Sequence, residues 1–217
     1  MFGHSLGANT APLIAAEEKV KGIISYGVAG KPWLEYLIDL SREQRTLVGG
    51  DYIKTDERMR IALPLLYELL VLKKTPAELE KNPAFKAYLE NSFGYDGNNH
   101  LFGRHYTFLQ ELQDMPMVKA WRDADAYTLT IYGEADLQAL CPEGAQFITN
   151  IVNSYHPGKG TYKFLPQTDH GFAKVGTKQE YQRLMESGAY EKIGETNFNP
   201  EIVEIVDTWI KNKLRKT

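Results

Sequence analysis

The stretch Gly3-His4-Ser5-Leu6-Gly7 has the spacing G-x-S-x-G, and it decides the fold that this chain is expected to adopt. The spacing is typical of a tight strand-to-helix turn that raises a serine hydroxyl above the end of a parallel sheet. We expect both glycines to be required, because backbone segments approach closely at such a turn and a Cβ would collide. Only Met1 and Phe2 precede the motif, so we expect the earlier strands of the sheet to be missing from this sequence.

The residues after the motif predict one strand–helix–strand unit. Residues 6–18 are rich in alanine, which lets a helix pack tightly on a sheet, and residues 22–28 form a short apolar run. A short apolar run bounded by turn signals is typical of a buried strand. The order of turn, helix and strand therefore predicts a parallel α/β arrangement.

In residues 31–125 the sequence pattern changes, and the new pattern predicts a helical insertion. Leucines and aromatic residues recur there at helical spacing, as in Trp33, Tyr36 and Leu37. Thr75-Pro76 and Asn82-Pro83 are typical of helix starts. Residues 93–103 hold several Gly, Asn and Asp residues and predict a loop. An insertion of this length between two strands of a parallel sheet is typical of a lid or cap.

The strand pattern resumes after residue 126. Residues 127–132 and 161–165 are predicted strands, with a predicted helix over 142–155 between them and a closing amphipathic helix over 199–214. The sequence thus predicts an incomplete α/β core made of residues 1–30 and 126–217. Residues 31–125 are the predicted helical cap.

Composition and charge exclude several classes of function. The 217 residues are 43% hydrophobic and 24% charged, which is ordinary for a globular domain. The net charge of −3, without a basic block, disfavours a nucleic-acid partner. No apolar run reaches the length of a membrane span. Cys141 is the single cysteine, so no disulfide forms within the chain. If Met1 is the natural start, the absence of a signal peptide predicts a cytoplasmic protein.

Three residues that can carry acyl-transfer chemistry follow the ends of predicted strands, in the order Ser, Asp, His. Ser5 lies in the first turn, Asp136 follows the strand over 127–132, and His170 follows the strand over 161–165. A serine needs a neutral imidazole to take its proton, and the imidazole needs a carboxylate that fixes its tautomer. Glu134 and Asp169 are competing carboxylates. Asp136 is preferred because Gly133 supplies the turn that exposes it.

The remaining candidates are supporting residues. Asp169 is expected to cap or brace the loop that carries His170, and His4 is expected to support the nucleophile from the neighbouring position. The other histidines lack the spacing of metal ligands, so no metal site is predicted. Cys141 is expected to be a small, wholly or partly buried residue, because no motif that activates a thiol surrounds it.

Three blocks together resemble the α/β-hydrolase superfamily, most closely its serine-aminopeptidase-like and carboxylesterase-like branch with a helical cap. They are residues 3–8, 131–136 and 169–172, and they span most of the chain. The resemblance implies a nucleophile at Ser5, an acid at Asp136 and a base at His170. It also implies that the amide of Leu6 is one oxyanion donor. No cofactor is predicted.

The resemblance leaves several substrates and roles open. Carboxylic esters are the favoured substrates, and short peptides cleaved by a serine-aminopeptidase-like enzyme are the alternative. A non-catalytic remnant that acts as a binding protein is a further alternative, because the superfamily's second oxyanion donor would precede Met1. With the early strands missing, the unpaired edge of the sheet predicts self-association.

Overall fold

A computed structural model describes residues 1–215, with the side chain of Glu195 left out. Contacts divide the chain into two compact units, which are described separately. The sheet unit comprises residues 1–30 and the residues from Pro116 on, and the helical unit comprises Lys31–Met115.

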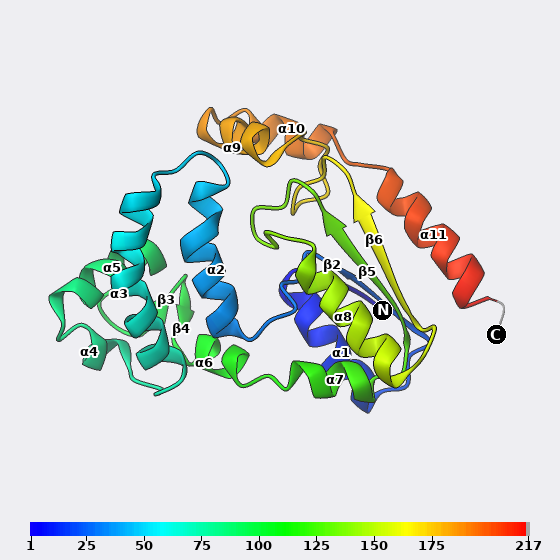
Figure 1. The fold of residues 1–217 in the computed structure, drawn as a ribbon, viewed down its shortest axis with the longest axis horizontal. Helices are drawn as coiled ribbons and strands as arrows, with labels where there is room; N and C mark the ends of the chain where they lie inside the picture. The colour runs from blue at the N-terminus through cyan, green and yellow to red at the C-terminus, as the bar shows by residue number, and fades with distance from the viewer. Residues whose placement is uncertain (216–217) are drawn as a thin grey trace. The chain divides into compact units, whose positions relative to one another are not determined.

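The sheet unit is built on four parallel strands in the order β1-β2-β5-β6 (Figure 1). The strands are β1 (Phe2–His4), β2 (Gly22–Tyr26), β5 (Tyr127–Gly133) and β6 (Gly160–Leu165). Helix α1 (Leu6–Glu17) connects β1 to β2, and α8 (Glu143–Tyr155) connects β5 to β6. Since all four strands run the same way, their carboxyl ends meet at one edge of the sheet, where the predicted site residues follow them.

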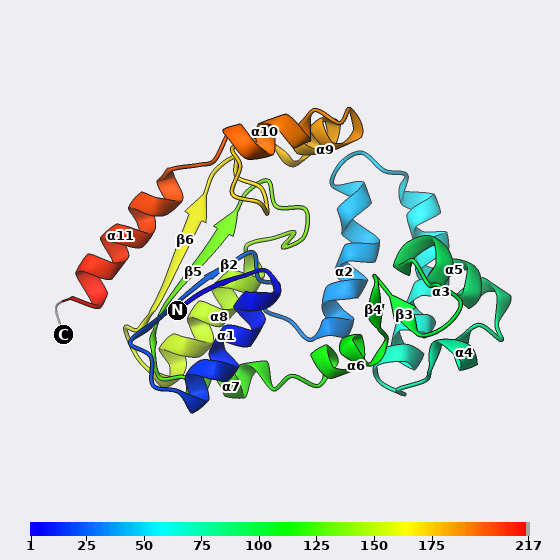
Figure 2. The ribbon, with the colours of Figure 1, turned by 180° about the vertical axis from the view of Figure 1, so that it is seen from behind.

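Helices cover both faces of this sheet, as a fully parallel sheet requires. On one face Ile23 packs in a cluster with alanines of α1 and with residues of α8. On the other face Ile24 and Tyr26 pack with Trp209 of α11 (Glu201–Lys213). Figure 2 shows α11 on the opposite side of the strands from α1 and α8. The alternation of Ile23 and Ile24 thus places one apolar layer on each face of β2.

Most predicted elements of the sheet unit are confirmed, with shifts of a few residues at their ends. The strand predicted over 22–28 ends at Tyr26, and the helix predicted over 6–18 ends at Glu17. Two helices between residues 178 and 196 were not among the predictions. They are α9 (Lys178–Glu186), which begins with a capping box between Thr177 and Glu180, and α10 (Tyr190–Thr196).

The helical unit contains α2 (Trp33–Thr46), α3 (Tyr52–Leu70), α4 (Pro76–Leu79), α5 (Pro83–Phe93) and α6 (Thr107–Gln113). Its core is centred on fully buried leucines of α3, including Leu65, Leu66 and Leu69. The predicted helix starts are confirmed, because Thr75 forms a capping box with Glu78 and the side chain of Asn82 accepts from the amide of Ala84.

The segment predicted as a plain loop contains and adjoins regular structure. Strand β3 (His100–Leu101) pairs antiparallel with β4 (Arg104–His105), so the stretch over 93–103 leads into a small hairpin. Phe102 and Gly103 form its turn, and both have positive φ.

Helix α7 (Met117–Asp123) belongs to the sheet unit rather than to the helical unit. Trp121 is 1% exposed and packs in the cluster that contains Ala8 and Ala11 of α1. The contact boundary therefore falls between Met115 and Pro116, before the predicted boundary at residue 125. The role of the helical unit as a cap stays a prediction.

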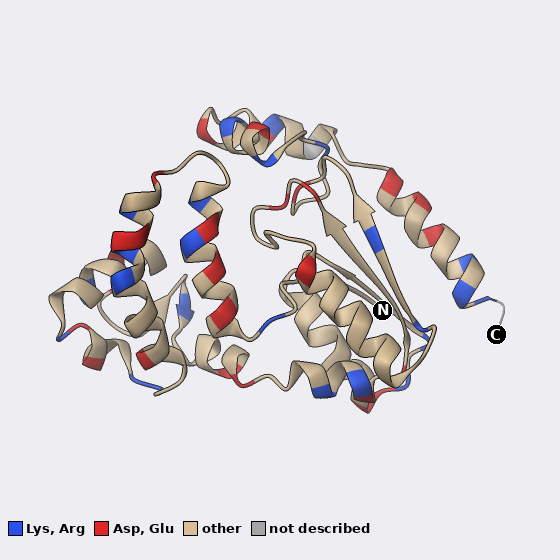
Figure 3. Ribbon diagram, viewed as in Figure 1, with Lys and Arg blue, Asp and Glu red and all other residues tan. Residues whose placement is uncertain are grey.

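Charged side chains of both signs are interspersed along the helices of each unit (Figure 3). On α11 they follow the helix dipole, with Glu201 and Glu204 in the first turn and Lys211 and Lys213 in the last turn. No helix within residues 1–215 combines the length and the apolar composition that crossing a membrane requires.

Candidate functional site

Ser5 lies at the turn where β1 passes into α1, in a strained backbone conformation. Its φ is 55° and its ψ is −123°, and a left-handed φ is uncommon for a residue with a side chain. The amide of Ser5 donates to the carbonyl of Tyr26 at 3.0 Å, which ties the turn to the end of β2. The hydroxyl does not cap α1, although serine is among the preferred capping residues. The turn therefore leaves the serine side chain without the usual structural role at a helix start.

The two glycines of the motif are not equivalent. A Cβ on Gly3 would lie 2.5 Å from the carbonyl oxygen of Gly7 and 2.8 Å from the Cα of Ala8, both of them backbone atoms. A Cβ on Gly7 would meet nothing within 4 Å. The expectation that both positions exclude a side chain is therefore wrong for Gly7, because the space that its Cβ would occupy is open.

Asp136 and His170 form a buried hydrogen-bonded pair. The Nδ1 of His170 donates to the Oδ2 of Asp136 at 2.8 Å, and the two residues are 8% and 0% exposed. The other carboxylate oxygen accepts from the amides of Gln138 at 2.7 Å and Ala139 at 2.9 Å. Both oxygens of Asp136 thus accept hydrogen bonds. The backbone amides hold the carboxylate in place, and the carboxylate in turn fixes the orientation of the imidazole ring.

The Nε2 of His170 is buried and has no hydrogen-bond partner among the described residues. The pair of Asp136 and His170 is therefore assembled, whereas a hydrogen bond from the Ser5 hydroxyl to His170 is not formed. Catalytic hydrogen bonds are often long or poorly aligned in a structure without substrate.

Gly27 makes room for the imidazole, a requirement that sequence reasoning missed. It has a φ of +66°, and a Cβ there would lie 2.7 Å from Cε1 and 2.8 Å from Nδ1 of His170. The same Cβ would lie 3.4 Å from the Oδ2 of Asp136. The available signal was the position of Gly27 at the carboxyl end of a strand that neighbours the motif.

His4 contacts the loop of His170, and its bond goes to that loop's backbone. Its Nε2 donates to the carbonyl of His170 at 2.8 Å, and the two rings have centroids 4.7 Å apart. Burial, followed by the proximity of His170, lowers the pKa of His4. His4 therefore supports the candidate base rather than the hydroxyl of the adjacent serine.

Asp169 is fully buried and holds the loop through several contacts. Its Oδ1 accepts from the amide of Ala173 at 2.8 Å, and its Oδ2 accepts from the hydroxyl of Tyr190 at 2.5 Å. Its carbonyl accepts from the hydroxyl of Tyr26. Burial raises the pKa of both tyrosines well above the usual value, so they remain hydroxyl donors. The two tyrosines were not among the predicted site residues.

Leu6 is the first residue of α1, and the first amides of a helix have no partner within the helix. Glu134, the competing carboxylate, faces a different way, because it accepts from the amide of Gln167 at 2.9 Å. Within residues 1–215, no group of three or more His, Cys, Asp and Glu side chains is arranged to hold a metal ion.

No protein-family model matches the sequence. No curated protein matches it either. Among solved structures, a thermostable carboxyl esterase of Bacillus coagulans is 18% identical with a TM-score of 0.40, and the match covers 90% of this chain and 64% of that one. A carboxylesterase of Nitrososphaera gargenis is 18% identical with a TM-score of 0.39, over 87% of this chain and 63% of that one.

A monoacylglycerol lipase of Paleococcus ferrophilus is also 18% identical with a TM-score of 0.39, over 89% of this chain and 67% of that one. The chain thus spans less than two thirds of the length of the two esterases. Scores this low say nothing about what the chain binds or does. In its own architecture, the chain resembles the α/β-hydrolases: it has a parallel sheet with helices on both faces, and Ser5, Asp136 and His170 follow strands β1, β5 and β6 of that sheet.

Proposed function

We propose that the sheet unit carries a serine hydrolase site, with Ser5 as nucleophile, His170 as general base and Asp136 as the partner of the base. The observation that supports it most is the buried pair of Asp136 and His170, in which the Nε2 of His170 has no hydrogen-bond partner in the part of the chain that the structure describes. All three residues follow strands of one parallel sheet, so they belong to the same sheet edge.

The pair defines the state of the imidazole. With the Nδ1 proton donated to Asp136, the lone pair of a neutral His170 lies on Nε2. Nε2 is then the atom that takes the serine proton, and the adjacent carboxylate stabilises the imidazolium that forms. The backbone donors on Asp136 hold the carboxylate in place while the charge on the ring changes.

Ser5 would attack the carbonyl carbon of the substrate as its proton passes to His170. A tetrahedral intermediate forms and then expels the alcohol, which receives the proton from His170. Water repeats the sequence on the acyl-enzyme and restores the serine. The strained turn fits this role, because a strand-to-helix turn with a left-handed residue exposes the hydroxyl at the top of the sheet.

The amide of Leu6 is the proposed donor to the oxyanion. It directly follows the nucleophile and opens α1, so its N–H has no partner within the helix and the helix dipole favours negative charge there. One oxyanion donor is typically worth about a hundred- to a thousandfold in turnover.

Carboxylic esters are the proposed substrates, with short peptides as the alternative. A peptide substrate with a free amino group needs a carboxylate to receive it. The two buried carboxylates of the site, Asp136 and Asp169, already use both of their oxygens on protein donors. This favours an uncharged ester over an amino-terminal peptide.

Hydrolysis of p-nitrophenyl esters and of an amino-acid p-nitroanilide tests the proposal. We expect ester turnover by the wild type and a loss of about a thousandfold or more in Ser5→Ala and in His170→Gln. Ester turnover that survives Ser5→Ala would overturn the assignment of the nucleophile. Preference for the anilide would overturn the assignment of the substrate.

The second candidate is a non-catalytic binding protein. The observation in its favour is that no hydrogen bond joins Ser5 to the Nε2 of His170 in the described structure. A folded wild type that turns over neither the esters nor the anilide would support this candidate over the hydrolase.

A further inference from the structure

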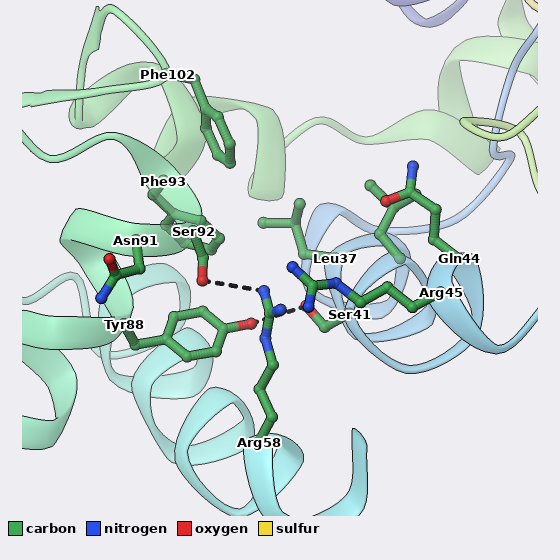
Figure 4. Close-up of a pocket in the computed structure, with 11 residues that line it drawn as sticks. Leu37, Ser41, Gln44, Arg45, Arg58, Tyr88, Asn91, Ser92, Phe93 and Phe102 are labelled. Carbon is green, nitrogen blue, oxygen red and sulfur yellow. Dashed lines mark hydrogen bonds between the residues drawn. The ribbon is translucent and has the colours of Figure 1, made fainter. Parts of the chain in front are cut away.

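The helical unit contains a pocket of about 230 Å³ that the proposed hydrolase chemistry does not use. Residues of α2, α3 and α5, together with Phe102 from the β3–β4 turn, line it (Figure 4). Its lining combines two arginines, several hydroxyl and amide groups, and an apolar side made of leucines and phenylalanines.

The two arginines, Arg45 and Arg58, bring positive charge to the pocket without a compensating carboxylate. Neither makes an ion pair with any residue that the structure describes. The Nε of Arg58 is buried and has no hydrogen-bond partner within residues 1–215. Leaving a buried donor of a charged group unpaired is costly, so such groups normally have a partner.

The protein nevertheless fixes the Arg58 side chain. Its Nη2 donates to the hydroxyl of Ser92 at 3.0 Å, and its guanidinium lies 5.1 Å from the centroid of the Tyr88 ring. The hydroxyl of Tyr88 in turn donates to Ser41 at 3.2 Å. Figure 4 shows this chain of contacts around the guanidinium. A guanidinium held in this way is already oriented for a ligand, so little rotamer entropy is lost on binding.

The opposite side of the pocket is apolar and partly open. Phe93 is 4% exposed, whereas Phe102 is 51% exposed and lies against it with ring centroids 4.7 Å apart. Phe102 has a φ of 52°, and its amide donates to the carbonyl of Phe93 at 2.6 Å. A large apolar side chain is thus kept near solvent by a strained backbone, which is a common feature of ligand sites.

We propose that this pocket binds a small organic anion, with a carboxylate or phosphate group on Arg58 and Arg45 and an apolar body against Phe93 and Phe102. Guanidinium groups match the planar oxygens of both anions. The volume lies below the range of about 300–1,000 Å³ that drug-sized ligands occupy, so the ligand is small. The contacts of Arg58 with Ser92 and Tyr88 would be enough if its role were only structural. They do not neutralise the positive charges of Arg45 and Arg58, which an anionic ligand would neutralise.

Benzoate and phenyl phosphate are the probes that carry both halves of this ligand. Titration calorimetry would measure their affinity, and ¹H–¹⁵N spectra of the arginine Nε–Hε groups would report which guanidinium responds. We expect both probes to bind and to shift the Arg58 signal, and benzyl alcohol, which lacks the charge, to leave it unmoved. An equal response to benzyl alcohol would overturn the anion assignment. If inorganic phosphate bound as tightly as phenyl phosphate, the proposed contact of an apolar ligand body with Phe93 and Phe102 would be overturned.

Variants locate the response. We expect Arg58→Gln to weaken binding of both probes by about ten- to a hundredfold, because a charge-assisted hydrogen bond is lost. Arg45→Gln changes an exposed side chain and should weaken binding without affecting folding. The matched control is Arg60→Gln on the same helix, since Arg60 is exposed and pairs with Asp56 at 3.2 Å. Unchanged affinity in both pocket variants, or an equal loss in the control, would overturn the proposal.

Discussion

Two carboxylates follow β5 within three residues of each other, and their surroundings give them different tasks. Asp136 is fully buried and accepts from the ring of His170, whereas Glu134 is exposed and accepts from a backbone amide. The sequence favoured Asp136 because of the turn at Gly133. The structure gives a physical reason for the same choice. Of the two carboxylates, only Asp136 contacts the ring of His170, so only Asp136 can fix the tautomer of the imidazole.

Asp136→Asn tests that task. The amide oxygen can still accept from Gln138 and Ala139, but the amide nitrogen would face Nδ1 of His170 and force it to be an acceptor. Nε2 would then carry the proton and could not act as a base. We expect ester turnover to fall on the order of a thousand- to ten-thousandfold. Glu134→Gln is the control and should change turnover by no more than about twofold; equal losses in the two variants would contradict the assignment.

His4 links the stability of the site to pH. Burial and the nearby His170 lower its pKa below the ordinary value of 6.5. In the unfolded chain His4 takes up a proton near that value, while in the folded chain it does so only at lower pH. As the pH falls through this window the unfolded state binds more protons, so the free energy of unfolding decreases. The hydrogen bond to the carbonyl of His170, and then the charges of Asp136 and Asp169, raise the pKa of His4, but they do not outweigh burial.

We therefore expect His4→Gln to flatten the loss of stability on the acid side. Glutamine can keep a donor toward the carbonyl of His170 and cannot be protonated in this range. Urea unfolding between about pH 7.5 and pH 5.5 measures the slope, above the range in which most carboxylates titrate. The control is His105→Gln, at an exposed position. A slope in His4→Gln as steep as that of the wild type would rule out the shifted histidine.

At the scale of elements, the contact between β1 and α1 sets the position of Ser5, and only one glycine of the motif is essential to it. Gly3→Ala forces a Cβ against backbone atoms of α1, so we expect a loss of about 1–3 kcal/mol in the free energy of unfolding. Gly7→Ala places a methyl group in open space within the helix and should be neutral or stabilising by up to about 1 kcal/mol. Urea denaturation of the two variants gives the comparison. A Gly7→Ala chain destabilised as much as Gly3→Ala would contradict the described packing.

The sequence predicted the strands and caps that depend on local pattern. The runs after residues 22 and 127 are buried strands because β-branched and aromatic residues fill both faces of a parallel sheet. Thr75 and Asn82 start helices because their side chains satisfy free amides.

What could not be predicted depends on contacts distant in sequence. Helix α7 belongs to the sheet unit because Trp121 packs on alanines of α1. The sequence around residue 121 does not indicate that these alanines are its packing partners. Tyr26, the last residue of β2, donates to the carbonyl of Asp169, and Gly27 after it leaves room for the ring of His170; both contacts join residues that are far apart in sequence. Asp136 and His170 were predicted as site residues from their places after two strands, but the contact between them depends on the neighbouring positions of β5 and β6 in the sheet.

At the scale of the whole molecule, the open edge of the sheet predicts self-association. The amide of Ser5 donates to the carbonyl of Tyr26, and the carbonyl of Met1 accepts from the amide of Ile24, so alternate residues of β1 bond to β2. The backbone groups of the residues between them, Phe2 and His4, therefore point away from β2 toward the edge of the sheet. An apolar groove of about 270 Å³ adjoins this edge, lined by Phe2, Phe172, Phe198, Ile202, Val203 and Val206. Unpaired backbone next to apolar surface is a template for another chain.

Sedimentation velocity measures this directly. We expect the wild type to form dimers or larger species, and Phe2→Lys to shift the population toward the monomer. Phe147→Lys on α8 is the matched control, since Phe147 is 48% exposed and Phe2 is 50% exposed. A wild type that sediments as a compact monomer at all concentrations would contradict the prediction.

The most direct test of the proposed hydrolase is covalent labelling by a fluorophosphonate, followed by mass spectrometry of the modified peptide. The reagent reacts with a serine only where a base removes its proton and donors stabilise the developing oxyanion. We expect one label on Ser5 in the wild type, none in Ser5→Ala, and strongly slowed labelling in Asp136→Asn. A folded wild type that stays unlabelled, or a label on a serine other than Ser5, would contradict the proposal.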